Sequence, residues 1–309
     1  MGECIRPSQM GCQSGTVGLF RLAAVFLTTW ACGQVFAATE ATEEPASPPP
    51  FVNAISDQLV SIRNTEVGSE GVTLTARLSA HSLSPAQDVS WRIHNAAGEI
   101  LIESRSGEID ANLPPGEYQV TAALGFLQIT EPLTVPRGSK LQISYILNAG
   151  ALRLLPRLGG AMNRELEAQN KVFALDGTVQ GNLIATSRVP GEVLMLAAGR
   201  YRIESTFAAG NARAVTDVHV KPGIMSAVDI DHIATAVKLE ANGVVSDASI
   251  WSVVAGNGDD VAEIMGATGL LALHPGSYTA TLTTPTVRNT QNFSIEAGGP
   301  QSITVVIAP

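Results

Sequence analysis

From about residue 70 onward, apolar and polar residues alternate along the chain with a period of two. The alternation is clear in 72–78, 89–94, 118–123 and 141–146. In an extended strand it places apolar side chains on one face, whereas an amphipathic helix repeats every 3.6 residues. The runs are short and are separated by Gly, Pro, Asn or Asp, which favour turns. The sequence therefore predicts half-buried strands joined by turns, and only 160–170 has a pattern that a short helix would also produce.

One turn motif occurs three times. Its copies are Leu113-Pro-Pro-Gly116-Glu-Tyr118, Leu196-Ala-Ala-Gly199-Arg-Tyr201 and Leu273-His-Pro-Gly276-Ser-Tyr278. A second glycine turn follows each copy at a similar distance: Val135-Pro-Arg-Gly138, Val220-Lys-Pro-Gly223 and Ile295-Glu-Ala-Gly298. Trp91 and Trp251 precede the first and third copies at equal spacing, and the second copy keeps this region only loosely. Repetition of this kind indicates tandem modules, which we place at 68–148, 149–233 and 234–309.

The fold class that follows is all-β. Each module has enough alternating runs for two sheets packed face to face, with one apolar and one polar side to each strand. Trp91 and Trp251 alternate in phase with their apolar neighbours, so both are expected in a core. We therefore predict three tandem β-sandwich modules after a cleaved signal peptide and a short proline-rich linker.

The turn motif has a structural and a functional interpretation. In the structural one, Gly116, Gly199 and Gly276 take positive φ in a type II turn, and the tyrosine two residues later buries its ring. The tyrosine hydroxyl then bonds back across the turn, as in the tyrosine corner of immunoglobulin-like sandwiches. In the functional one, the same tyrosines contact a ligand. Recurrence in all three copies favours the structural interpretation.

These residues also carry a family resemblance. The segments LPPGEYQVTAALGF and LTVPRGSKLQISYIL, which span 113–126 and 133–147, look like the second half of a carboxypeptidase-regulatory-like or prealbumin-like β-sandwich module. The Gly125-Phe126 pair completes the resemblance in the first copy, and the other two copies lack it. The resemblance implies a non-catalytic accessory or adhesive role.

The N-terminus predicts export. Arg6 and Arg21 precede an uncharged apolar run at 22–32, and Val35 and Ala37 suit signal peptidase positions −3 and −1. The run is too short to span a bilayer, which needs about 20 residues. We expect cleavage after residue 37, with translation starting at Met1 or Met10, and no membrane span after cleavage. The remaining chain would be periplasmic or secreted.

A linker and lead-in are expected at 38–67. The stretch 38–50, ATEATEEPASPPP, is acidic and rich in proline and small residues, which favours an extended spacer. All three cysteines of the chain, Cys4, Cys12 and Cys32, lie in the predicted signal peptide. The mature chain would have no disulfide, thiol nucleophile or thiolate metal site.

Composition excludes two classes of protein. The 309 residues are 45% hydrophobic and 15% charged, with a formal net charge of −9. Extensive disorder needs low hydrophobicity and high net charge. A nucleic-acid partner needs clustered Lys and Arg, which the chain does not have.

Candidate catalytic and metal-binding residues are scattered. The histidines after residue 37 are too far apart in sequence for an HxH or HExxH metal motif: His81, His94, His219, His232 and His274. His274 occupies a turn position of the repeated motif and is expected to fill that turn. We therefore predict no catalytic, cofactor-binding or metal site, and no enzyme.

Two acidic groups have alternative interpretations. Asn257, Asp259 and Asp260, around Gly258, look superficially like a calcium loop, but the equivalent 95–99 is a plain hairpin turn. Calcium binding at 256–260 is therefore left open. Asp229 and Asp231 share one face of a strand and are expected to lie on a solvated face or at a module junction.

The function predicted from the sequence is a non-catalytic structural, adhesive or scaffold role in the cell envelope. Its partner would be an envelope protein or a polysaccharide. The alternative is a ligand-binding array for carbohydrate or peptide, although exposed aromatic residues, which such sites usually need, are few.

Overall fold

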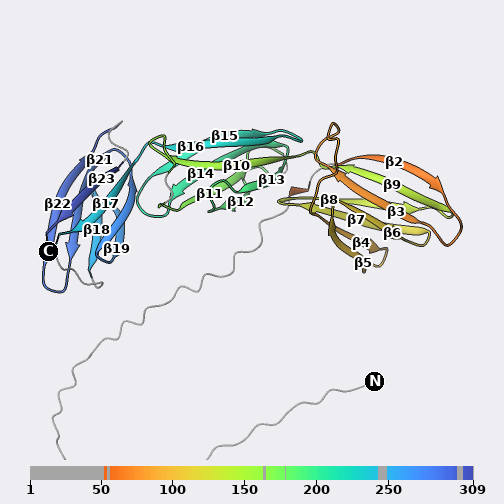
Figure 1. Cartoon of the computed structure of the whole chain (residues 1–309), viewed down its shortest axis with the longest axis horizontal. Coiled ribbons are helices and arrows are strands. Elements are labelled where there is room, and N and C mark those ends of the chain that lie inside the picture. The colour runs from red at the N-terminus through yellow and green to blue at the C-terminus, as the bar shows by residue number, and fades with distance from the viewer. Residues whose placement is uncertain are drawn as a thin grey trace, which may run out of the picture. The chain divides into compact units, whose positions relative to one another are not determined.

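The computed structural model describes residues 52–53, 56–162, 165–177, 179–242, 249–297 and 302–308. All secondary-structure elements in this part of the chain are β-strands, so the predicted all-β class is confirmed (Figure 1). The segment 160–170 forms no helix among its described residues. The described residues contain no helix suited to crossing a membrane. The predicted signal peptide at 1–37 and the proline-rich stretch 38–50 lie outside the described residues.

The second sandwich shows the basic arrangement. Its first, fourth and seventh strands form one sheet, in the order β13-β10-β16, and the other four form the second sheet, in the order β12-β11-β14-β15. The first and last strands, β10 and β16, run parallel, and all other pairs are antiparallel. The strands are β10 (Ala149–Leu158), β11 (Ala168–Ala174), β12 (Leu183–Ser187), β13 (Val193–Ala197), β14 (Gly199–Phe207), β15 (Arg213–Val220) and β16 (Met225–His232).

The third sandwich repeats this order, with sheets β20-β17-β23 and β19-β18-β21-β22. Its strands are β17 (Thr235–Ala241), β18 (Ile250–Ala255), β19 (Asp260–Met265), β20 (Thr268–Leu273), β21 (Gly276–Thr283), β22 (Arg288–Ile295) and β23 (Ser302–Ile307). The order differs from the immunoglobulin constant domain, in which strands A, B, E and D form one sheet.

The first sandwich has the same core arrangement with one strand added to each sheet, giving β2-β9-β3-β6 and β1-β8-β7-β4-β5. Its strands are β1 (Val52–Asn53), β2 (Asp57–Asn64), β3 (Gly71–Arg77), β4 (Val89–Asn95), β5 (Ile100–Ser106), β6 (Glu108–Asn112), β7 (Gly116–Leu124), β8 (Leu127–Val135) and β9 (Ser139–Ile146). The extra strand β2 lies within 38–67, the segment assigned to linker and lead-in.

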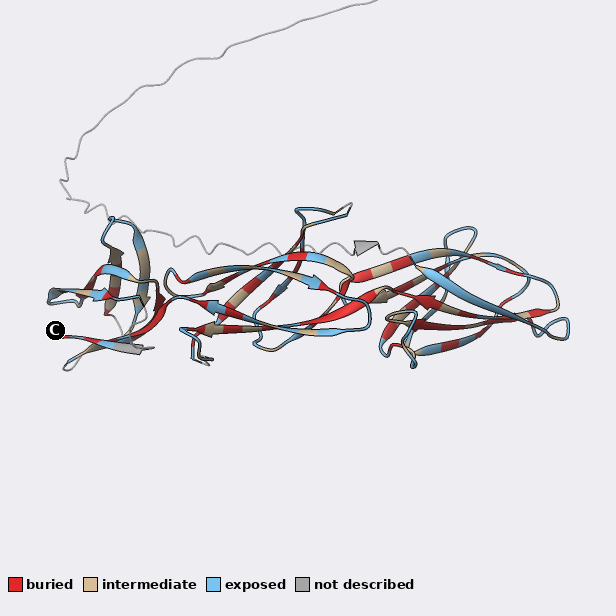
Figure 2. Ribbon diagram, turned by 90° about the horizontal axis from the view of Figure 1, so that it is seen from above, coloured by how far each residue is buried: buried red, intermediate tan, exposed pale blue. Residues whose placement is uncertain are grey.

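The cores lie between the paired sheets, and buried residues alternate with exposed ones along most strands (Figure 2). Trp91 in β4 and Trp251 in β18 are fully buried, which confirms their predicted place in a core. The Trp91 indole N–H donates to the carbonyl of Ser106 at 3.1 Å. Because both side chains are fully buried, neither tryptophan is available as a sugar-binding platform.

The repeated tyrosines form the predicted corner in all three sandwiches. Each hydroxyl donates to the backbone carbonyl four residues earlier: Tyr118 to Pro114 at 2.7 Å, Tyr201 to Ala197 at 2.8 Å and Tyr278 to His274 at 2.8 Å. The turn carries the chain from one sheet to the other, from β6 to β7 in the first sandwich. The hydroxyl therefore fixes the point at which the chain changes sheets.

The predicted positive φ is wrong for two of the three turn glycines. Gly116 and Gly199 do not have positive φ, whereas Gly276 does, at 158°, a value that is nearly extended and far from that of a type II turn. Each is the first residue of a strand rather than the third residue of a type II turn. A β-carbon at Gly116 would lie 3.6 Å from the Tyr118 ring, an ordinary contact. Positive φ values close to that of a type II turn occur at the second repeated glycine turn instead, 66° at Gly138 and 72° at Gly223.

We predict that Tyr201→Phe lowers the free energy of unfolding by about 1 kcal/mol, the usual net value of one hydrogen bond. Burial, and to a lesser extent Asp176, raises the pKa of the Tyr201 hydroxyl to about 12. Because the folded pKa lies above the unfolded value, this stabilisation is complete below about pH 10 and is lost as the pH rises toward 12. Urea unfolding of both proteins at several pH values measures the difference; an equal stability at neutral pH would contradict the prediction.

Candidate functional site

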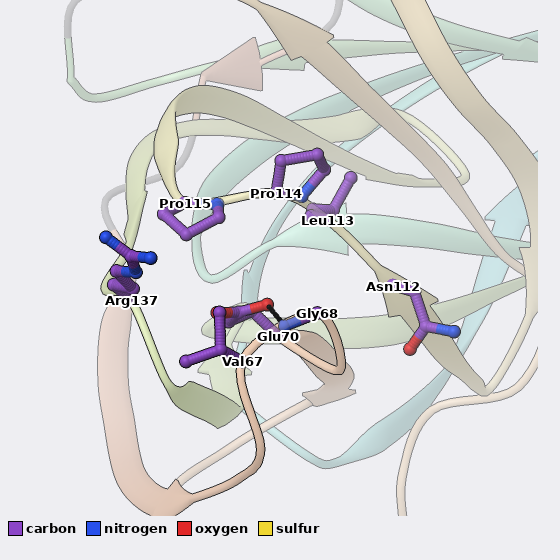
Figure 3. Close-up of a pocket in the computed structure, with 8 residues that line it drawn as sticks. All are labelled: Val67, Gly68, Glu70, Asn112, Leu113, Pro114, Pro115 and Arg137. Atoms are coloured by element: carbon purple, nitrogen blue, oxygen red, sulfur yellow. Dashed lines mark hydrogen bonds between the residues drawn. The ribbon is translucent and has the colours of Figure 1, made fainter.

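A surface pocket of about 640 Å³ lies at the turn end of the first sandwich (Figure 3). Three segments distant in sequence form it: the loop after β2, the turn after β6 and the turn between β8 and β9. Its lining residues are Val67, Gly68, Glu70, Asn112, Leu113, Pro114, Pro115 and Arg137. The repeated turn motif thus forms one wall, and the walls opposite come from loops that β3 and β9 hold in place.

Glu70 organises the floor of this pocket. It is buried, and its carboxylate accepts the backbone N–H of Gly68 at 2.7 Å and that of Gly138 at 3.0 Å. The hydrogen bond from Gly138 is the main cause of the lowered pKa of the Glu70 carboxyl, and the nearby Arg137 guanidinium contributes least. The carboxylate is therefore ionised at neutral pH and tied to both loops, so its role here is to position backbone rather than to accept a proton from a substrate.

Apart from Asn112, the remaining polarity of the pocket comes from Arg137. Its side chain is exposed and forms no ion pair with any described residue. Pro114, Pro115 and Val67 supply apolar surface in the same pocket, with Pro115 beside the guanidinium in the view of Figure 3. A guanidinium beside apolar surface can bind a carboxylate-bearing ligand, because it presents several N–H donors in a fixed fork. The arrangement allows binding but supplies no nucleophile with an adjacent base.

The sequence did not indicate Glu70 or Arg137. Glu70 directly precedes β3, where the second and third sandwiches have Gly150 and Thr235 by strand register. An acidic residue at a position that is not acidic in the other two copies is a signal that could have identified Glu70 as a candidate.

The histidines do not come together. His81 and His219 are exposed, and His94 lies beside its own hairpin, 3.4 Å from the Gly98 carbonyl. His232 is fully buried between the two sheets of the second sandwich, where its ring nitrogens lie 3.0 Å and 3.1 Å from the carbonyls of Arg157 and Ser205. His232 therefore links the two sheets, and both of its hydrogen-bond partners are backbone carbonyls.

His274 does more than fill its turn. Its Nε2 accepts the backbone N–H of Arg213 at 3.1 Å, and its Nδ1 lies 2.8 Å from the carbonyl of Ile233. Asn211 accepts the backbone N–H of His274 at 3.0 Å and donates to the Tyr278 hydroxyl at 3.1 Å. Loop residues before β15 therefore dock onto the repeated turn before β21, a junction that the sequence did not predict.

The acidic candidates occupy structural positions. Asn257 and Asp259 bond to each other through a side-chain contact of 2.7 Å, beside Gly258 at φ 90°. Asn95 closes the equivalent turn in the first sandwich, so the hairpin interpretation is confirmed. The described residues contain no group of three or more His, Cys, Asp or Glu placed to hold a metal ion.

Asp229 and Asp231 lie on the exposed face of β16. Asp229 pairs with Arg157 at 2.7 Å, and Asp231 accepts the backbone N–H of Gly160 at 2.8 Å. The predicted solvated strand face is confirmed, because the two carboxylates have separate partners.

No family model and no curated protein match the chain. Solved structures of low similarity include the Bacillus anthracis TIE protein (15% identity, TM-score 0.24), of which the chain spans half the length, with 78% of this chain covered. A streptococcal ancillary pilin has 10% identity and a TM-score of 0.27, with 82% of this chain and 98% of that chain covered. The minor pilin of Streptococcus agalactiae has 13% identity and a TM-score of 0.25, with 52% and 94% covered.

We predict that Glu70→Gln destabilises the first sandwich at neutral pH, because a neutral amide is a weaker acceptor for the two loop N–H groups. The folded pKa of Glu70 lies below its unfolded value, so the stabilisation is present above about pH 4.5 and is lost as the pH falls through the folded pKa. The difference in melting temperature should therefore shrink in acid. A difference that stays constant down to pH 2 would contradict the prediction.

We also predict that Asn211→Ala lowers the free energy of unfolding by about 1–2 kcal/mol, because it removes two side-chain hydrogen bonds at the junction. Asn292→Ala is the matched control: its amide oxygen accepts one bond, from Thr279, on an exposed strand. Thermal unfolding should show the larger loss for Asn211→Ala. Equal losses in the two variants would contradict a role for Asn211 in holding the junction.

Proposed function

We propose that the chain is a non-catalytic, exported envelope protein with a structural or adhesive role, built from three sandwich modules at 68–148, 149–233 and 234–309, the first of which is extended by the strands β1 and β2. It would act in the periplasm or outside the cell after removal of residues 1–37. Its partner would be an envelope protein or a polysaccharide. The role of the modules would be to present binding surface at a distance set by their number and by the linker.

One observation carries this proposal: the repeated residues are used for internal structure. The three tyrosine hydroxyls bond within their own turns, and the repeated tryptophans are buried. Residues that recur in each copy and hold a sandwich together indicate that the module is repeated to build a longer protein. Repetition of a binding site would leave the same side chains exposed.

We also propose that the sandwiches are of the carboxypeptidase-regulatory-like type. The resemblance of 113–126 and 133–147 to carboxypeptidase-regulatory-like modules is compatible with the sheet order, in which the first, fourth and seventh strands form one sheet. Such modules are usually accessory to another activity, which agrees with the proposed role.

The second candidate function is ligand binding, and the pocket beside Arg137 favours it. This pocket belongs to the first sandwich, so the candidate is one binding module rather than an array. A peptide or sugar acid with a carboxylate would suit the guanidinium and the proline surface.

A substitution in the pocket distinguishes the two functions. Arg137→Ala removes the exposed cation, and Arg288→Ala removes an exposed arginine from β22 as the matched control. If the role is structural, both variants should stay with the cell-envelope fraction in the same amount as the unchanged protein. Fractionation with N-terminal sequencing measures this and the predicted start at Ala38.

Ligand binding predicts a different outcome for the two variants. Loss of Arg137→Ala alone from the envelope fraction, at an unchanged melting temperature, would replace the structural role by ligand binding. Retention of residues 1–37 in the exported protein would contradict the predicted cleavage.

A further inference from the structure

The three sandwiches differ in how one sheet edge is covered. In the second and third, the sheet formed by the first, fourth and seventh strands ends at β16 and at β23. In the first, the equivalent strand β9 is covered by β2, which pairs with it antiparallel over eight residues. The outer backbone groups of β16 and β23 therefore have no strand partner among the described residues.

The strand pairing shows which residues of β9, β16 and β23 occupy equivalent positions. Gly71 pairs with Lys140 in the first sandwich, and Ala236 pairs with Ser302 in the third. The turn motif gives the same alignment, because Gly71 also pairs with Asn112 and Ala236 with Ala272, each just before the motif leucine. Val306 in β23 therefore corresponds to Ser144 in β9, and Asp229 in β16 occupies the same position.

The two free edges have different chemistry. β16 carries Asp229 and Asp231 on its exposed face, and charged residues protect an edge against pairing with another chain. The sequence of β23, SITVVI, has no charge and no proline, and Val306 is 46% exposed. An uncharged, β-branched edge is suited to accept a further strand.

β2 is held weakly on its own sandwich. All eight of its residues are exposed, including Leu59, Val60 and Ile62. Arg63 lies directly opposite Lys140, and like charges in opposite positions destabilise a strand pair; Lys140 has its carboxylate partner, Asp110, within the sheet, and Arg63 has none among the described ion pairs. β2 therefore gains little by burial where it lies.

We propose that the free edge of β23 accepts residues 57–64 of a second copy of this chain, in the register that these residues have on β9. Leu59 would then face Val306 rather than Ser144, and Arg63 would face Ser302 rather than Lys140. The exchange replaces a polar neighbour by an apolar one and removes a like-charge pair, while the main-chain hydrogen bonds of the added strand are kept.

The contact joins different surfaces of the two copies. Each copy has one donor strand and one acceptor edge, so the contact can repeat from copy to copy and produce a chain or a closed ring. This inference deepens the proposed structural role and rests on it, because it names the partner as a second copy.

Cysteine cross-linking tests the register. The chain from residue 38 on has no cysteine of its own, since all three lie at 4, 12 and 32. Chains 38–309 with Leu59→Cys are mixed with chains carrying Val306→Cys under mild oxidation, and mass spectrometry of the dimer band identifies the linked peptides. Directly opposite residues have β-carbons about 5 Å apart, within reach of a disulfide after small adjustment.

Two controls define the result. Thr304→Cys lies on the same strand and face as Val306 but at a diagonal position, about 7–8 Å away, and Val215→Cys is a similarly exposed residue in β15. We expect the Val306→Cys pair to form at least tenfold faster than either control pair. A rate no higher than that of Val215→Cys would overturn the proposal, and a rate equal to that of Thr304→Cys would overturn the register. Either failure leaves the structural role intact, which the fractionation of Arg137→Ala tests separately.

Discussion

The hydrogen bond from each repeated tyrosine to the carbonyl four residues earlier is the contact on which the sandwiches depend. A two-sheet sandwich requires the chain to leave one sheet and enter the other without exposing the core. The turn between the fourth and fifth strands of the shared arrangement does this in all three copies. The tyrosine packs against the core there, buried in the second and third sandwiches and partly buried in the first. The hydroxyl satisfies a carbonyl that the turn would otherwise leave without a strand partner.

The same turn has acquired a different use in different copies. In the first sandwich it is one wall of the pocket beside Arg137. In the third, its His274 and Tyr278 receive Asn211 from the loop of the second sandwich. A small apolar cluster, which includes Phe207 and Ala272, lies beneath this junction. A repeated structural element thus offers a constant backbone on which single substitutions create local differences.

Much of the fold could be predicted from the sequence, because the determinants are local. Alternation fixes which face of a strand is buried, as Trp91 and Trp251 show, and a tyrosine two residues after the turn glycine can reach the backbone carbonyl four residues earlier. The conformation of Gly116 and Gly199 was mispredicted for a related reason. Pro-Gly favours a type II turn in isolation, but Gly116 is here already the first residue of β7.

The candidate site could not be predicted, because its determinants are distant in sequence. Glu70 acts on Gly138, and Asn211 acts on His274 and Tyr278, over separations of more than sixty residues. No periodicity relates such positions. Only the sheet order brings them together, and that order was not available from alternation alone. The sheet edges follow the same logic: whether β2 covers an edge or β23 leaves one free depends on pairing, not on local pattern.

Native-state hydrogen exchange of Tyr201→Ala tests the central claim most directly. If the tyrosine corner fixes the crossing between sheets, amide exchange should rise across both sheets of the second sandwich, from β10 to β16. Faster exchange confined to the turn at 196–200, with the strands as protected as in the unchanged protein, would contradict the account.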